Sequence, residues 1–453
     1  MNLPGECQEF YEWRDRRTVE YAGRTVHDLA ALHVVVDAAS CASAPGQLLL
    51  LALANQLARV NRRVSFSLGD PDALMLARTP FRGDRLAEVL LTTVSSIDPC
   101  GEFRLGPPFP GRTVRLGVGA DVSERLDWYL GADRAVAFLR RSPVPVSSTS
   151  ATIRGAALAS CLGCATAFRA CFGLAVSERS LSAWNYAEGS EAAPGPESPP
   201  TIDVGRVLMV GAGAVGGSLA YWVHAFGADC RDWTVVDGDV VELHNTNRGM
   251  VFTPRDSGWP DGTAAFKAHI VASSMRGAKS FNRWYHECDS LAAMQFDVVL
   301  ALANDYDVRE RLTQRHAAVS FQATTGENWL SQLHRHILGT DGCIACRTGE
   351  LRTTAFACST VPVEAPNHLR SDAALPFLSA ASGLMLALAL DRLTIGDEVE
   401  AANCWSWDFD SGHRMATRPG RHLCHEACTR IPSAIIQRRL ALGTRWVNLV
   451  GRS

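Results

Sequence analysis

The sequence feature that most constrains the fold is a glycine-rich turn between a predicted strand and a predicted helix. Residues 206–210 (RVLMV) form the strand, and residues 218–226 form the helix. The turn has the pattern G-x-G-x-x-G, with its glycines at Gly211, Gly213 and Gly216. The first glycine permits a tight turn, the second lets a phosphate approach the backbone, and the third lets helix and strand pack closely. The helix N-terminus then faces the phosphates, so the pattern predicts a Rossmann-like nucleotide site rather than a glycine-rich turn without a ligand.

The residues after this turn favour ATP over NAD or FAD. A second predicted strand, residues 233–236, ends in Asp237, at the distance from the glycines where an acidic side chain bonds ribose hydroxyls. Asn245, Arg248 and Lys267 follow it. A dinucleotide dehydrogenase has no need for these side chains just past its ribose-binding acid, whereas a triphosphate site needs cations there.

Together these residues resemble the ThiF/MoeB/ubiquitin-activating superfamily over roughly residues 204–430. The pattern of that superfamily is a Rossmann-like G-x-G-x-x-G, then D-x-D-x-V-x-x-x-N-x-x-R, then a lysine shortly after a glycine. The resemblance implies that Asp237 holds the ribose and that the later side chains line the triphosphate. The implied nucleotide-binding residues are Gly211, Gly213, Gly216, Asp237, Asp239, Asn245, Arg248, Lys267 and Asn304, with Asn247 in a position where the family often has Gln or Asn.

The same resemblance implies a magnesium ligand at the end of the next strand, an aspartate with an arginine five residues further on. The predicted strand at residues 297–302 is followed by Asn304 and Asp305, and Arg309 comes later. Spacing to Arg309 selects Asn304, whereas residue type selects Asp305. We expect Asp305 to bind magnesium because a hard cation prefers a carboxylate oxygen. Asp307 is expected to be a helix N-cap instead.

Four cysteines form two close pairs. Cys343 and Cys346 form a C-x2-C, and Cys424 and Cys428 form a C-x3-C. Two such pairs predict a tetrahedral zinc site with four thiolate ligands. The superfamily has a structural zinc between cysteine pairs at these places in the chain. Four core cysteines are the alternative, and His425 as a substitute ligand is a minor variant.

Cys358 stands alone in a polar segment, residues 349–372. The resemblance implies that this segment is the crossover loop. In several conjugating systems of the superfamily, the cysteine of this loop forms a thioester or an acyl-disulfide. The polar, proline-bearing surroundings predict an exposed loop, where a reactive thiol is useful, although a buried structural cysteine is the alternative. The implied catalytic residues are Cys358, Arg248, Lys267 and Asp305.

The chain before the glycine motif repeats the alternation of strands and helices. Strands are predicted at residues 32–37, 64–68 and 115–119, and apolar helices at residues 45–60 and 154–174. This β-α-β rhythm predicts a parallel sheet. The turn after the first strand lacks the spacing of a glycine-rich phosphate loop.

We therefore predict an α/β chain with two Rossmann-like halves and a zinc-stapled C-terminal part. Residues 1–187 form an inactive adenylation-type domain, and residues 188–201, rich in Pro, Glu, Ser and Ala, form an exposed linker. Residues 202–453 form the active ATP-binding adenylation domain, which includes the crossover loop 349–372, the zinc site and a predicted helix at residues 375–393.

Composition excludes several classes of protein. The formal net charge of −3 lacks the excess of positive charge that is typical of proteins that bind nucleic acids irrespective of sequence. No apolar run reaches the roughly 18–20 residues that a membrane helix needs, and the polar, acidic N-terminus is not a signal peptide. With 14 cysteines and no secretory signal, we expect a cytoplasmic protein in a reducing compartment. We place Cys161, Cys164 and Cys171 in the core, on the apolar helix of the first half.

The resemblance implies ATP-dependent adenylation of the C-terminal carboxylate of a ubiquitin-like protein. Transfer to a cysteine and then to a conjugating enzyme follows. An inactive half fused to an active half looks like the arrangement of ubiquitin-type activating enzymes, and the compact size looks like the activating enzyme of a bacterial ubiquitin-like conjugation operon of the antiphage type. In homodimeric relatives an N-terminal arginine of one subunit reaches the ATP of the other. Arg14, Arg16 and Arg17 are candidates for that role here, in a homodimer or an internal pseudo-dimer.

Three alternatives stay open at this point. A ThiF- or MoeB-like enzyme would adenylate a sulfur-carrier protein, but such enzymes usually lack a large N-terminal half. A peptide-modifying adenylating enzyme would use its N-terminal region as a peptide clamp. A non-catalytic scaffold would only bind a ubiquitin-like tail, and the presence of Arg248 and Lys267 argues against it.

Overall fold

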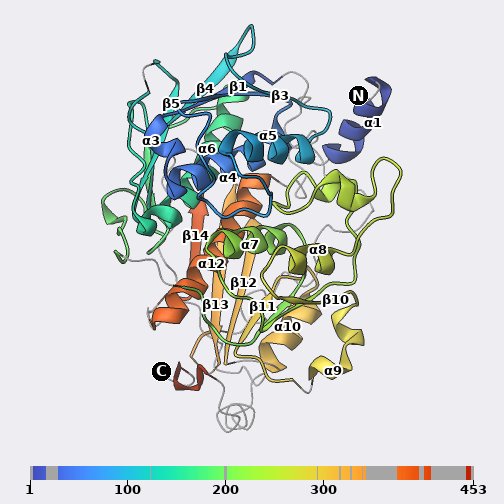
Figure 1. Ribbon diagram of the computed structural model, residues 1–453. Helices are drawn as coiled ribbons and strands as arrows, with labels where there is room; N and C mark the ends of the chain where they lie inside the picture. Colours follow the sequence, from blue (N-terminus) through green and yellow to red (C-terminus); the bar gives the residue numbers. More distant parts are fainter. Residues whose placement is uncertain are drawn as a thin grey trace, which may run out of the picture.

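The chain folds into two seven-stranded sheets, one in each half of the sequence, with helices packed between and around them (Figure 1). The computed structural model describes residues 4–16, 29–122, 124–197, 201–292, 294–315, 318–326, 329–338, 340–342, 375–396, 402–409 and 445–449. The first half lies in the upper part of Figure 1 and the second half in the lower part.

The sheet of the first half has the strand order β3-β2-β1-β4-β5-β6-β7. The first five strands of that order are parallel, and β6 and β7 extend one edge in antiparallel fashion. Their bounds are β1 Ala31–Val36, β2 Arg63–Leu68, β3 Glu102–Leu105, β4 Thr113–Val118, β5 Trp128–Asp133, β6 Val136–Arg140 and β7 Arg179–Ser182.

The sheet of the second half repeats this topology strand for strand, in the order β10-β9-β8-β11-β12-β13-β14. Five strands are again parallel, and β13 and β14 again form an antiparallel edge. Their bounds are β8 Val207–Val210, β9 Trp233–Val236, β10 Lys279–Phe281, β11 Val298–Ala301, β12 Val319–Gly326, β13 Leu330–Ile337 and β14 Cys404–Asp408. The common order agrees with the prediction of two Rossmann-like halves.

Helices follow the parallel strands, as the alternating pattern predicts. Those of the first half are α1 Pro4–Arg14, α3 Ala38–Cys41, α4 Ala44–Val60, α5 Leu86–Ile97 and α6 Ile153–Cys171. Those of the second half are α7 Ala214–Ala225, α8 Lys267–Ser273, α9 Asp289–Ala292, α10 Tyr306–Arg315 and α12 Pro376–Ile395, with the short 3-10 helices η4 Leu243–Asn245 and η5 Pro254–Ser257 before α8. α4 begins where expected because the Ser43 side chain accepts the Gly46 N–H at 3.2 Å.

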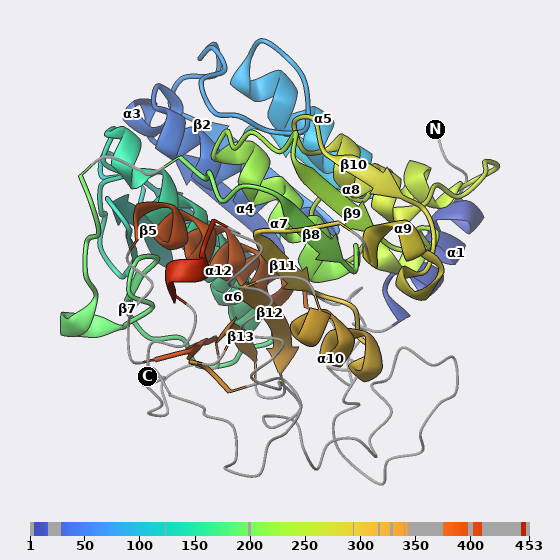
Figure 2. The same cartoon turned by 90° about the horizontal axis from the view of Figure 1, so that it is seen from below.

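The two halves share one continuous apolar core. Helix α6 packs on β4, β5 and β6 of the first sheet, α12 packs on β12 and β13 of the second, and the two helices contact each other. Figure 2 shows α4, α6, α7 and α12 gathered between the sheets. A buried ion pair joins Arg154 of α6 to Asp391 of α12 at 2.7 Å. The halves are therefore joined along their helical faces.

Two of these core helices correct the prediction that no segment could span a membrane. Ser150–Cys171 and Pro376–Ile395 are long and apolar enough to cross a membrane, by length and composition. Charged residues such as Arg154 and Asp391 interrupt their apolar runs. In the fold, 94% and 89% of their most apolar windows are buried inside the protein, and core helices pass the same test. Cys161, Cys164 and Cys171 lie buried on α6, which confirms their predicted place in the core.

Part of the segment predicted as an exposed linker contacts the first half. Glu188 pairs with Arg179 of β7 at 2.7 Å. The carbonyl of Pro194 accepts the Ala135 N–H at 3.0 Å. These bonds hold the beginning of the segment against the antiparallel edge of the first sheet, and residues 198–200 lie outside the described residues.

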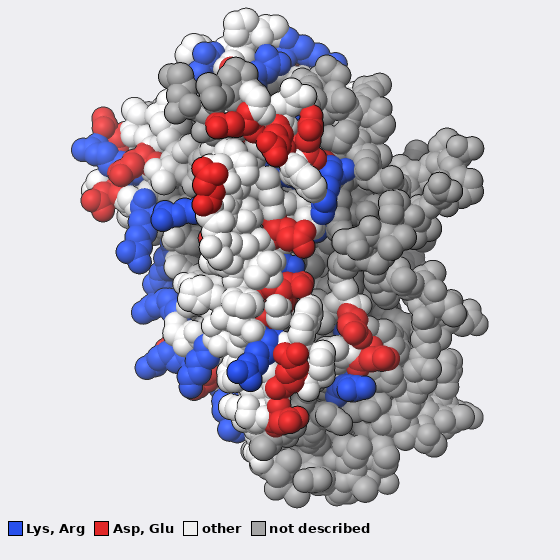
Figure 3. Space-filling model, turned by 90° about the vertical axis from the view of Figure 1, so that its right-hand side faces the viewer, with Lys and Arg blue, Asp and Glu red and all other residues white. Residues whose placement is uncertain are grey.

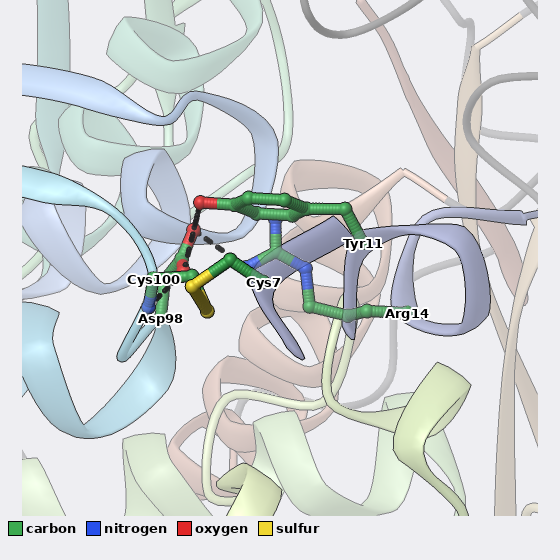
Figure 4. The surroundings of a disulfide bond; sticks show 5 residues. All are labelled: Cys7, Tyr11, Arg14, Asp98 and Cys100. Carbon is green, nitrogen blue, oxygen red and sulfur yellow. Dashed lines mark hydrogen bonds and ion pairs between the residues drawn. A yellow bond between two sulfur atoms is a disulfide. The ribbon is translucent and has the colours of Figure 1, made fainter. Parts of the chain in front are cut away.

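Helix α1 is attached to the first half by a disulfide between Cys7 and Cys100 (Figure 4). Beside it, the Tyr11 hydroxyl donates to both carboxylate oxygens of Asp98 at 3.2 Å, and Arg14 pairs with the same carboxylate at 2.8 Å. Burial raises the pKa of Asp98, and the Arg14 guanidinium opposes that rise. The expectation of a reducing compartment did not anticipate a disulfide, because nothing in the local sequence links residues 93 positions apart.

Candidate nucleotide site

The glycine turn lies at the carboxyl ends of β8 and β11, where the strand order reverses direction. Open α/β sheets bind ligands in this crevice. Gly211 has a φ of +103°, and a Cβ there would lie 2.4 Å from the Ala303 nitrogen, so only glycine fits. A Cβ on Gly216 would lie 2.6 Å from the Gly211 carbonyl oxygen, whereas a Cβ on Gly213 would meet nothing within 4 Å. The second glycine therefore leaves its backbone open to a ligand.

Helix α7 begins at Ala214, four residues earlier than predicted, with Gly213 as its N-cap. Glycine has no side chain that could accept a hydrogen bond, so Gly213 does not cap the N–H groups of the first turn. A helix N-terminus of this kind favours a bound phosphate.

The ribose-binding acid predicted from the sequence is held in place by backbone groups. The Ala212 N–H donates to Oδ2 of Asp237 at 2.6 Å, and the Asp239 N–H donates to Oδ1 at 2.9 Å. Burial raises the pKa of the Asp237 carboxyl, and these two N–H groups oppose the rise. Asp237 thus connects the glycine turn to the end of β9.

Lys267 pairs with Asp239, the second acid of the motif, although 28 residues separate the two in the sequence. Its ammonium is 2.8 Å from Oδ2 of Asp239, and its side chain is only 11% exposed. The Lys267 N–H also donates to the Asp239 carbonyl at 2.9 Å, at the start of α8. The fold therefore brings the predicted ribose acid and the predicted phosphate-binding lysine into one cluster.

The segment 243–252 carries the other predicted triphosphate side chains. Asn245 and Arg248 are buried, with Asn247 between them, and Oδ1 of Asn245 accepts the Glu242 N–H at 2.9 Å. Downstream, Phe252 is fully buried and lies over the start of α7, where its ring would be 3.4 Å from a Cβ on Gly217. The segment is therefore packed into the protein close to the glycine turn.

The residues predicted to bind magnesium follow β11. Asn304 and Asp305 are exposed, and Oδ1 of Asp305 accepts the Val308 N–H at 3.1 Å. Asp305 therefore caps α10, which corrects the expectation that Asp307 does so; Asp307 lies inside the first turn. Arg309 turns back to donate to the Ala303 carbonyl, and burial lowers the pKa of its guanidinium to about 10.

The matching crevice of the first half is occupied by a carboxylate. Asp37 follows β1, and its oxygens accept the N–H groups of Ser40 at 2.7 Å, Ala120 at 2.9 Å and Asp121 at 3.1 Å. A Cβ on Gly119 would lie 2.1 Å from the same carboxylate. A fixed negative charge there uses the N–H groups that a phosphate would need and repels it, which supports a nucleotide-free first half.

The three N-terminal arginines have different surroundings. Arg14 is fully buried and pairs with Asp15 at 2.7 Å as well as with Asp98, so it holds α1 in place. Arg16 reaches the second half, where its Nη2 lies 2.9 Å from Nδ1 of His244, next to Asn245. Arg17 lies outside the described residues.

The remaining predicted residues also lie outside the described part of the chain. These are the zinc candidates Cys343, Cys346, Cys424 and Cys428, and the acyl acceptor Cys358. Within the described residues, no group of three or more His, Cys, Asp or Glu is placed to hold a metal ion. The zinc site and the thioester cysteine stay predictions.

Sequence reasoning missed two kinds of residue near the site. Trp284 is 48% exposed, and its ring would be 2.7 Å from a Cβ on Gly238, between the two acids of the motif. Its only sequence signal is an aromatic residue shortly after a strand. Arg59 and Asn55 of α4 contact the segment 243–252 from the other half, and no sequence pattern indicates that.

The face that carries α1 and α9, on the right-hand side of Figure 1, is shown in Figure 3. On the described part of this face, acidic and basic side chains are intermixed, and neither sign forms a continuous field. This mixture agrees with the small net charge of −3.

The sequence model of the ThiF family matches residues 194–425, slightly more than half of the 453-residue chain. The chain belongs to the ThiF family. The match covers the glycine turn, the acids after β9, Lys267 and the residues after β11, so the family assignment rests on the half that carries the site. A search of curated proteins found no match.

Solved structures that resemble this ThiF-family chain include E. coli MccB. Its complex with succinimide shares 13% identity and a TM-score of 0.31, covering 43% of this chain and 57% of that one. Its complex with AMPCPP and selenomethionine MccA shares 12% identity and a TM-score of 0.33, covering 50% and 66%. In the first comparison the aligned part of the chain spans a little over half of the length of MccB.

Proposed function

We propose that this ThiF-family protein uses ATP to adenylate the C-terminal carboxylate of a ubiquitin-like protein. The observation that carries the proposal is the cluster at the switch point of the second sheet. There the open glycine turn, Asp237 and the Asp239–Lys267 pair converge, with Lys267 only 11% exposed. A sheltered ammonium beside a ribose-binding acid suits a nucleotide triphosphate and has no evident use in a dinucleotide dehydrogenase.

In this reaction a carboxylate oxygen of the substrate forms a bond to the α-phosphorus of ATP. The bond between that phosphorus and the bridging oxygen breaks, and pyrophosphate leaves. The obstacle is repulsion between the carboxylate and the triphosphate. Lys267 and Arg248 offset it, since hydrogen bonds to charged groups contribute roughly 1.5–3 kcal/mol each, and preorganised charge is usually the largest catalytic contribution.

Magnesium fits the exposed oxygens that follow β11. Asp305 would hold the ion, with Asn304 beside it, because one oxygen of this carboxylate caps α10 and the other can face a cation. When bound, magnesium would neutralise charge on the departing pyrophosphate.

Arg16 is our candidate for the arginine that homodimeric relatives borrow from a partner subunit. Its guanidinium already contacts His244 at the edge of the 243–252 segment, and Glu242 lies 3.8 Å away. Arg14 is a weaker candidate because it forms a buried ion pair with Asp98. The fused first half would then supply within one chain what a homodimer supplies between chains.

After adenylation, the thiolate of Cys358 would attack the acyl carbonyl and displace AMP. The thioester would pass to a conjugating enzyme, and zinc bound by Cys343, Cys346, Cys424 and Cys428 would anchor the C-terminal part. We propose that the protein works in the cytoplasm of a bacterium and that its gene belongs to an antiphage ubiquitin-like conjugation operon. Support for these points comes from the sequence resemblance.

Pyrophosphate exchange tests the proposal. Labelled pyrophosphate should enter ATP only when a carrier protein ending in Gly-Gly and with a free carboxylate is present. Exchange with a ubiquitin-like carrier that then forms a reductant-sensitive adduct supports the proposal. Exchange with a sulfur-carrier protein and no adduct indicates the ThiF/MoeB-like alternative, a short peptide as the only substrate indicates a peptide-modifying enzyme, and ATP-independent binding of the tail without exchange indicates a scaffold.

A further inference from the structure

Two buried side chains of α4, in the nucleotide-free half, extend into the nucleotide-binding half. Arg59 and Asn55 lie one helical turn apart, and they are 1% and 0% exposed. Both point at the segment 243–252 rather than at their own sheet. Such placement is unusual for a long charged side chain, because burying an arginine costs free energy unless its donors are satisfied.

The donors of Arg59 are taken up by the backbone carbonyls of that segment. Its Nη1 donates to the carbonyl of Phe252 at 3.0 Å and to that of Thr246, and its Nη2 donates to the carbonyl of Met250 at 3.0 Å. Asn55 Nδ2 donates to the same Met250 carbonyl at 3.0 Å, while Asn55 Oδ1 accepts the Arg59 Nε–H at 3.0 Å. Asn55 therefore both orients the guanidinium and adds a bond of its own.

These carbonyls flank Arg248 on both sides in the sequence. The internal backbone bonds of the segment are all short-range turn bonds. The N–H groups of Arg248 and Gly249 donate to the Asn245 carbonyl at 3.3 and 3.1 Å, and those of Thr246 and Phe252 donate to carbonyls three residues earlier. Without a sheet or a long helix of its own, its path depends on the contacts it receives from outside.

The Arg59 guanidinium donates to neutral acceptors, which are the three carbonyls and Asn55 Oδ1. Among the described residues, no carboxylate lies within ion-pair distance of its guanidinium, and burial lowers its pKa to about 9. An apolar side chain could join the two halves at less cost in desolvation. The planar fork of arginine, by contrast, fixes several acceptors in one geometry.

We propose that Arg59 and Asn55 are positioning residues for the nucleotide site, through which the nucleotide-free half sets the conformation of the Arg248 segment. The inference rests on the proposed function only in taking that segment to bind the triphosphate. The first half would then be required for nucleotide binding even though it holds no nucleotide. Because one guanidinium holds three carbonyls in a fixed geometry, a lysine can replace it only in part.

The test uses the full chain and two measurements. Arg59→Gln and Arg59→Lys are compared with Arg154→Gln. This control variant breaks a different buried contact between the halves, the ion pair with Asp391 at the packed helices. We expect amide hydrogen exchange in residues 246–252 to become about tenfold faster in Arg59→Gln. We expect the Kd for AMPCPP with magnesium to rise by about 10- to 100-fold, since a small misplacement of a binding group costs that much. Arg59→Lys should fall between Arg59→Gln and the wild type.

Arg154→Gln should lower the unfolding midpoint while leaving both readouts within about twofold of the wild type. Equal effects of Arg154→Gln and Arg59→Gln on the 246–252 amides and on Kd would overturn the inference, because Arg59 would then act only in joining the halves. If Arg59→Gln does not fold, Asn55→Ala replaces it, and unchanged exchange and Kd in that variant would count equally against the inference. If the wild type does not bind AMPCPP, the proposed function fails, and the exchange measurement still decides whether Arg59 positions the segment.

Discussion

Lys267 is the residue on which we expect the proposed nucleotide site to depend most. The chain has 44 basic residues, but only Lys267 and Lys279 are lysines. Lys267 is held against Asp239 at 2.8 Å and nearly buried, whereas Lys279 is exposed at the start of β10. A compact ammonium fits beside a carboxylate and a phosphate where a wide guanidinium does not.

Arginine should therefore fail at one lysine position and succeed at the other. Lys267→Arg should lower kcat/KM for pyrophosphate exchange by at least about tenfold, which corresponds to losing one charged hydrogen bond. Lys279→Arg is the matched control and should match the wild type. Equal activity of both variants would show that position 267 needs only positive charge.

At the scale of elements, helix α1 is fixed by contacts with other parts of the chain. The Cys7–Cys100 disulfide, Tyr11 and Arg14 fix it to the first half, and Arg16 just after it contacts His244 of the second. The order of α1 therefore bears on the edge of the nucleotide site.

Opening the disulfide should loosen this helix without unfolding the protein. A crosslink that closes a loop of about 95 residues stabilises by roughly 4–5 kcal/mol in the chain-entropy account, and less where other contacts persist. We expect a reductant to lower the melting temperature of the wild type but not that of Cys7→Ser. A melting temperature that a reductant leaves unchanged in the wild type would mean that the two thiols are not paired in solution.

The C-terminal part should depend on a metal ion. If Cys343, Cys346, Cys424 and Cys428 bind zinc, the purified protein should contain about one zinc per chain. Cys346→Ser should lose the metal and stability together, because binding energy at a structural zinc site is folding energy. Cys230→Ser, at a buried cysteine before β9, is the control that should retain the metal. A well-folded preparation without zinc would contradict the site.

At the scale of the whole molecule, the sequence predicted what local patterns encode. The strand at β9 was placed at its observed bounds, and the glycine turn predicted the open approach at Gly213. The helix α7 began earlier than expected because the glycines in its first turn, Gly216 and Gly217, have low helix propensity. Local patterns cannot show contacts between distant residues, so Arg59, Asp37 and the Cys7–Cys100 pair emerged only from the fold.

Transfer of the acyl group to Cys358 is a further prediction at the scale of the whole molecule. Cys358→Ala should keep pyrophosphate exchange, because adenylation needs only ATP and a carboxylate. It should lose the reductant-sensitive adduct with the carrier, because no thiolate remains to attack the adenylate. Should the adduct persist, the adenylate would pass directly to the cysteine of a conjugating enzyme.

The central claim is that two halves with the same topology have different roles. The second half binds ATP, and the first half holds the nucleotide site in its binding conformation. Asp37 follows β1, which corresponds to β8 of the second sheet, whereas Asp237 follows β9, the neighbour of β8. Each carboxylate accepts backbone N–H groups beside the crevice of its own half. The most direct measurement is pyrophosphate exchange in Asp237→Asn and Asp37→Asn, with circular dichroism to confirm folding. The account predicts a loss of at least about 100-fold for Asp237→Asn, because ribose positioning is lost, and activity within about threefold of the wild type for Asp37→Asn. Equal losses in both variants, or a loss confined to Asp37→Asn, would contradict it.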